Sequence, residues 1–101
     1  MKVKNYKIKS KVWIYPGNNP WHFVTIPKKQ SKNIDLQYGK MKRGWGSLPV
    51  HVSIGTIKWE TSIFPDKKSS TYLLPLKAHI RRQIGLESGD TVTYTLAIRV
   101  E

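Results

Sequence analysis

The chain has 101 residues, which suits one domain with a modest core, so the sequence predicts a single domain over residues 1–101. It carries 18 Lys and Arg against 6 Asp and Glu, and the net charge of +12 favours polyanionic partners. The absence of cysteine excludes disulfides, thiolate metal sites and cysteine nucleophiles, and the short apolar runs predict a cytoplasmic protein with no membrane span.

The first third of the chain predicts two strands and a helix. Residues 6–15 alternate with a period of two, which is typical of a strand. The turn-rich "PGNNP" separates them from a second strand at residues 21–26, which Pro27 ends because proline cannot donate to a ladder. Ile34 and Tyr38 then mark a short helix over residues 28–38, with Gly39 as its expected stop. One face of the first strand is predicted to carry Tyr6, Ile8, Ser10, Val12 and Ile14.

The rest of the chain repeats this plan. Residues 40–49 have no period and predict a loop, and two strands follow at residues 50–54 and 57–64 around a Gly55-Thr56 hairpin. A strand at residues 71–74 ends at Pro75, a basic helix begins near Lys77, and Gly85 is expected to stop it in a left-handed conformation. A final alternating strand runs from Thr91 to Val100.

The two halves therefore share one order of elements. Each contains strand, strand, proline, helix and strand, and Pro27 and Pro75 are 48 residues apart. This weak internal repeat predicts a mainly β protein, a six-stranded barrel with pseudo-two-fold symmetry and a short helix at each end. Because both halves lie in one chain, it also predicts a monomer.

Several segments carry a family resemblance. The segments are "WHFVTIP", "GWGSLPVHVSIG", "TSIFP" and "STYLLPLKAHIRRQIGLESGDTVTYTL". With them, the chain from about residue 6 to residue 100 resembles a bacterial family of domains of unknown function, found alone or ahead of a bacteriocin-protection domain. The resemblance implies a double-split β-barrel, similar to AbrB-type regulators and MazE-type antitoxins, and it implies no activity. The DNA-contacting residues of those regulators are not recognisable here.

The motifs for catalysis and metals argue against an enzyme and against a cofactor. His22, His51 and His79 belong to three different predicted elements, without carboxylates at ligand spacing. The chain has no Gly-x-Ser-x-Gly motif, and its "GWG" is not followed by a helix that could cradle a phosphate. We therefore expect a non-enzymatic binding module.

Two groups of residues are candidates for binding. Lys7, Lys9 and Lys11 share a strand face with Trp13, a pattern that suits weak, sequence-indifferent binding of nucleic acid or another polyanion. Fourteen of the 18 cations are lysines, so the alternative is a lysine-rich coat, or lysines that protect an edge strand from pairing. The second group predicts a small-anion or small-ligand pocket at a barrel end, and a protein-interaction module is a third possibility. The pocket candidates are Trp59, Thr61, Ser62, Tyr72, Lys77 and Arg81.

Overall fold

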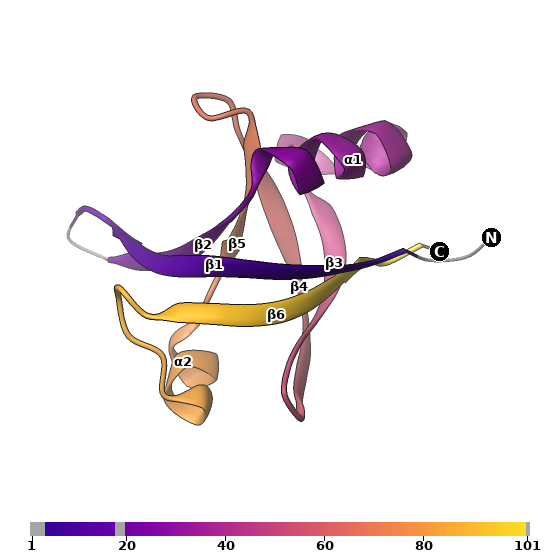
Figure 1. The fold of residues 1–101 in the computed structure, drawn as a ribbon. Helices are drawn as coiled ribbons and strands as arrows, with labels where there is room; N and C mark the ends of the chain where they lie inside the picture. The colour runs from indigo at the N-terminus through magenta and orange to yellow at the C-terminus, as the bar shows by residue number, and fades with distance from the viewer. Residues whose placement is uncertain (1–3, 18–19, 101) are drawn as a thin grey trace.

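The structure, a computed structural model, describes residues 4–17 and 20–100, so the predicted Pro16–Pro20 turn lies partly outside the described residues. Six antiparallel strands form a closed barrel in the order β1-β2-β5-β4-β3-β6 (Figure 1). This confirms the predicted fold class. In chain order the elements are β1 (Asn5–Tyr15), β2 (Trp21–Ile26), α1 (Lys28–Tyr38), η1 (Gly39–Met41), η2 (Gly44–Gly46), β3 (Leu48–Ile54), β4 (Ile57–Asp66), β5 (Thr71–Pro75), α2 (Ala78–Ile84) and β6 (Thr91–Ile98).

The two longest strands each take part in two sheets. β1 pairs with β6 from Asn5 to Lys11 and then with β2 from Val12 to Tyr15. β4 likewise pairs first with β3 and then, from Phe64, with β5. The first sheet therefore contains β6, β3 and the N-terminal parts of β1 and β4, and the second contains β2, β5 and their C-terminal parts. This is the double-split arrangement expected for the chain.

The strand pairing also shows the pseudo-two-fold relation. In the contact between β2 and β5, Val24 faces Leu74 and Ile26 faces Tyr72. Moving Val24 forward by 48 residues gives Tyr72, and moving Leu74 back by 48 residues gives Ile26, so the first pair becomes the second. The pairing is therefore symmetric about Thr25. The contact between β3 and β6 behaves in the same way about Val50 and Ile98, which face each other. The repeat seen in the sequence is thus present in the register.

The barrel interior contains the apolar positions of all six strands. Tyr6, Ile8 and Val12 of β1, predicted to share one face, are all buried, because alternate side chains of a strand point to the same face. Ile14 belongs to the same face but is 40% exposed, because it lies near the end of β1. The largest fully buried side chains include Ile26, Ile34, Leu48, Ile63, Leu74, Tyr94, Leu96 and Ile98.

The helices lie at opposite ends of the barrel, as predicted (Figure 1). α1 buries Ser31, Ile34 and Tyr38, whereas α2 buries Ile80 alone. Gly85 has φ 84°, the left-handed conformation that ends α2. α1 ends at Tyr38 with Gly39 as its C-cap, as expected, but Gly39 has φ −57° and not a left-handed conformation, and the chain continues into η1. The loop expected at residues 40–49 contains η2 and the start of β3.

Candidate binding surfaces

The outer face of the second sheet is covered by large apolar side chains. In the strand pairing Trp13 faces Phe23, Phe23 faces Pro75, and Phe64 faces Leu73. Since directly paired residues lie on one face of a sheet, these side chains form a continuous surface. We call it the aromatic face; its members are Trp13, Tyr15, Trp21, Phe23, Phe64, Leu73 and Pro75.

The rings of the aromatic face are close to one another and open to solvent. The ring centroids of Trp13 and Phe23 are 5.3 Å apart, and those of Trp21 and Phe23 are 6.2 Å apart with an interplanar angle of 12°. Tyr15 and Trp21 are 57% and 58% exposed. Trp13 is more constrained, because its indole nitrogen donates a hydrogen bond of 2.9 Å to the Thr25 hydroxyl. An apolar cleft of about 360 Å³ runs between these rings.

The three candidate lysines continue the same strand. Lys7, Lys9 and Lys11 are exposed on the outer face of the first sheet, opposite threonines of β6. Alternate residues of a strand are roughly 7 Å apart, so these lysines form a regular row that leads to Trp13. We call it the lysine row. The structure brings these four candidates together along β1. This part of β1 pairs with β6, and its pairing with β2 begins only at Val12.

The predicted pocket residues are divided between the two ends of the barrel. Thr61, Ser62 and Lys77 line one cleft of about 410 Å³. Lys77 and Arg81 line a second cleft of about 410 Å³, beside α2. Tyr72 belongs to the opposite end, in a cleft of about 470 Å³ under α1. The sixth candidate, Trp59, packs against the core. The structure therefore does not place all six in one pocket.

The cleft beside α2, here called the α2 cleft, contains an arginine with two side-chain contacts. The Nε atom of Arg81 donates a hydrogen bond of 3.1 Å to the Leu76 carbonyl, and its Nη1 atom lies 3.4 Å from Nε2 of His22. A guanidinium only donates, so Nε2 of His22 must accept and the ring must be neutral. Burial, followed by the charge of Arg81, holds the pKa of His22 below its usual value of 6.5, although an interaction with the Pro20 backbone opposes this shift.

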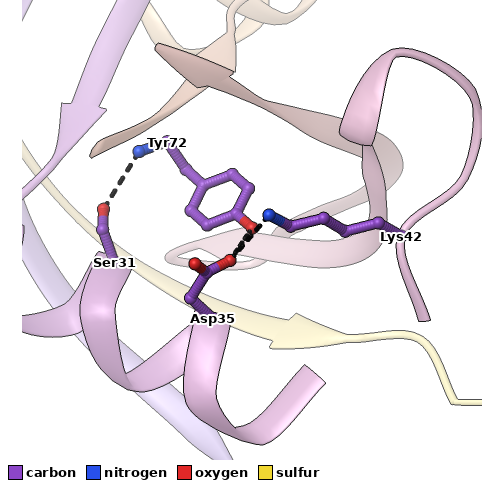
Figure 2. A network of polar contacts seen from close by, with 4 residues as sticks. All are labelled: Ser31, Asp35, Lys42 and Tyr72. Atoms are coloured by element: carbon purple, nitrogen blue, oxygen red, sulfur yellow. Dashed lines mark hydrogen bonds and ion pairs between the residues drawn. The ribbon is translucent and has the colours of Figure 1, made fainter. Parts of the chain in front are cut away.

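The end under α1 is closed by a polar network (Figure 2). The Tyr72 hydroxyl donates to the Asp35 carboxylate over 2.6 Å, and Nζ of Lys42 is 2.9 Å from the same oxygen. The buried Ser31 hydroxyl accepts from the Tyr72 backbone N–H and donates to the Ile26 carbonyl. We call these four side chains, Ser31, Asp35, Lys42 and Tyr72, the α1 network. It connects α1 to β2, to β5 and to the segment after η1.

The three pKa values that are shifted in the α1 network all move further from pH 7. Burial and the hydrogen bond to Asp35 raise the pKa of Tyr72 to about 12. Hydrogen bonds from Tyr72 and Lys42 lower the pKa of Asp35, and the carboxylate raises the pKa of Lys42. Each group therefore keeps its ordinary charge near pH 7. A general acid or base works best with a pKa near the working pH, so these shifts stabilise the network and do not prepare a proton transfer.

Two features of these surfaces were missed from the sequence. Trp21 and Phe23 alternate on β2 and could have been paired with Trp13 and Tyr15 as the exposed face of a hairpin. The contact between His22 and Arg81 joins residues 59 apart in the chain, and no local pattern points to it.

One known family matches nearly the whole barrel. The family described as Domain of unknown function (DUF1905) matches residues 9–96. The chain belongs to this family. No curated protein matches the chain.

Two kinds of feature are absent from the described residues. Among residues 4–17 and 20–100, the DUF1905 chain has no group of three histidine, cysteine or acidic residues placed to hold a metal ion. In the same part of the chain, no helix is both long and apolar enough to cross a membrane.

Proposed function

We propose that this DUF1905 domain is a non-enzymatic binding module for single-stranded nucleic acid. Bases stack on the aromatic face, and the lysine row neutralises the phosphates that follow. The observation that carries this proposal is the continuity of the two surfaces on β1, where Lys7, Lys9 and Lys11 lead directly to Trp13 and Tyr15. Proteins that bind single strands combine a cationic path with aromatic rings in this way.

The chemistry of the two surfaces favours binding without sequence preference. Every base has a flat face that can stack on Trp21 or Tyr15, and stacking contributes about 1–3 kcal/mol per base. Lysine acts on phosphates as a point charge, whereas base edges are read best by arginine, asparagine and glutamine. Binding is therefore weak and steeply dependent on salt, because lysines act by releasing counterions.

Two further features support this assignment. Contiguous exposed apolar patches often mark interaction sites, and Tyr15 and Trp21 of the aromatic face are each more than half exposed. The net charge of +12 makes an anionic partner the complementary one. We propose that the domain acts as a monomer, because the strand ring closes within one chain. A cytoplasmic location is part of the same proposal.

Fluorescence anisotropy with a labelled oligothymidylate at two salt concentrations tests the proposal. Changing Lys7, Lys9 and Lys11 together to Gln should weaken binding and reduce the salt slope by about 2, since each phosphate contact of a single strand contributes roughly 0.7. Trp21→Ala should weaken single-strand binding about tenfold and affect duplex less.

The matched control removes the same charge from a different surface. Lys28, Lys29 and Lys32 are exposed on α1, and changing all three to Gln should leave the salt slope close to that of the wild type. Equal losses in both triple variants would contradict the proposal and indicate a general lysine coat. A stable dimer in light scattering that Trp21→Ala dissociates would also contradict it, because a second copy would then cover the aromatic face.

A further inference from the structure

Arg81 is a partly buried cation held in place by neutral groups. Its side chain contacts the Leu76 carbonyl and the neutral His22 ring. Among the described residues, no carboxylate forms an ion pair with it; Asp35 pairs with Lys42 and Glu60 with Arg99. Charges that are removed from water are normally paired in proteins, and Arg81 is only partly exposed. The two contacts therefore orient the guanidinium before any ligand binds, and no carboxylate of the described residues compensates its charge.

The α2 cleft gives this guanidinium room for an anion. The cleft of about 410 Å³ is lined by Arg81, by Lys77 and by His22, and its apolar wall includes Trp21 and Pro75. Lys77 is exposed, so its ammonium can adjust to a ligand, whereas the fork of Arg81 is fixed by its two contacts. A fixed fork with a mobile second cation suits a phosphate group, which arginine binds in a bidentate manner.

The α2 cleft is also continuous with the aromatic face. Trp21 and Pro75 line both the α2 cleft and the apolar cleft between the rings. A base stacked on Trp21 therefore has its own phosphate within reach of the α2 cleft. Two cations match a phosphate monoester, which carries close to two negative charges at neutral pH, better than a phosphodiester with one.

We propose that the α2 cleft binds a phosphate monoester, through Arg81 and Lys77, next to an aromatic ring that stacks on Trp21. The monoester has two possible sources: the terminal phosphate of a strand on the aromatic face, or a free phosphorylated nucleoside. The first source rests on the function proposed above, and the second does not.

The experiment has one arm for each source. In the first arm, oligothymidylates with a 5′-phosphate, a 3′-phosphate or hydroxyl ends are compared by anisotropy. One terminal phosphate should raise affinity about tenfold in the wild type and in Arg82→Gln, and this gain should vanish in Arg81→Gln. Arg82 is the matched control, because it is exposed on the same helix and loses the same charge.

In the second arm, adenosine monophosphate is titrated into the wild-type protein and followed by NMR. The Arg81 Nε–H and Trp21 indole signals should shift together, and adenosine without phosphate should not move the Arg81 signal. This arm needs no variant, so the proposal stays testable even if Arg81→Gln unfolds the α2 end. As a further check, Arg81→Lys keeps the charge without the fork and should give an intermediate affinity.

The outcomes separate the two proposals. Shifts with adenosine monophosphate but no oligonucleotide binding support the phosphate site and contradict the single-strand function. The phosphate site is overturned if oligonucleotides bind equally well with and without a terminal phosphate and the Arg81 signal does not shift. The single-strand function would then still stand. A terminal-phosphate gain that survives in Arg81→Gln overturns the assignment to the α2 cleft.

Discussion

The two helical ends of the barrel follow one plan in the sequence but differ in how they are closed. α1 is fixed by the α1 network, in which the charge of Asp35 is compensated by Lys42 and the buried Ser31 has both a donor and an acceptor partner. α2 buries Ile80 alone and leaves the charge of Arg81 without a carboxylate among the described residues. The difference teaches that the two ends of a pseudo-symmetric fold can differ in how completely their polar and charged side chains are paired.

Removing the buried hydroxyl at the α1 end should give the largest effect on stability. Ser31→Ala deletes the acceptor of the Tyr72 N–H and the donor to the Ile26 carbonyl, both in a buried site. We expect the free energy of unfolding to fall by about 3 kcal/mol, because each buried polar group left unpaired costs roughly 1–3 kcal/mol. Urea denaturation measures it.

The same change at an exposed hydroxyl serves as the control. Ser47 donates to the Gly44 carbonyl in a solvent-exposed contact, so Ser47→Ala should cost less than about 0.5 kcal/mol. If Ser31→Ala costs no more than Ser47→Ala, the α1 network does not anchor the helix, and the contrast between the two ends is lost.

The glycines after the two helices should respond in opposite directions. Gly85 has φ 84° and open space around the position of a Cβ, so Gly85→Ala should destabilise by about 1 kcal/mol through backbone strain alone. Gly39 has φ −57°, and a Cβ there would be 3.7 Å from the Asp35 carboxylate, an ordinary contact.

Gly39→Ala should therefore be neutral or stabilise by up to about 1 kcal/mol, because alanine restricts the unfolded chain more than glycine does. Thermal melts of the two variants side by side provide the measurement. Destabilisation by both alanines to the same extent would show that the ends of the two helices do not differ in backbone conformation.

The smallest expected effect is a pH dependence confined to the α1 end. The folded pKa of Asp35 lies below its usual value of 3.8, so its contribution is fully present above that pH and is lost as the pH falls through the folded pKa. The side chain is 53% exposed, and after screening by solvent the contribution should be less than about 1 kcal/mol.

The stability difference between the wild type and Asp35→Asn should accordingly shrink as the pH is lowered below about 4. Urea melts at pH 7, 5, 4 and 3 measure this difference. A difference that stays constant over the whole range would mean that the Asp35 carboxylate does not contribute through its charge.

Much of the fold could be predicted because its signals are local. The alternation in residues 6–15 identifies β1, Pro27 and Pro75 mark the ends of β2 and β5, and the positive φ of Gly85 follows from its place after a helix. The conformation of Gly39 is informative: glycine permits the left-handed conformation but does not require it, and Gly39 ends α1 in a right-handed conformation that continues into η1.

The candidate surfaces were only partly predictable, for a physical reason. The lysine row and Trp13 lie on one strand, so the period of the strand places them together from the sequence by itself. The aromatic face draws on four strands, β1, β2, β4 and β5, and their neighbourhood is decided by strand order, which only the tertiary structure determines. The contact of Arg81 with His22 likewise depends on how β2 and β5 close the barrel beneath α2. Side-chain direction is a local property of the backbone, whereas pairing between distant segments depends on packing the whole core.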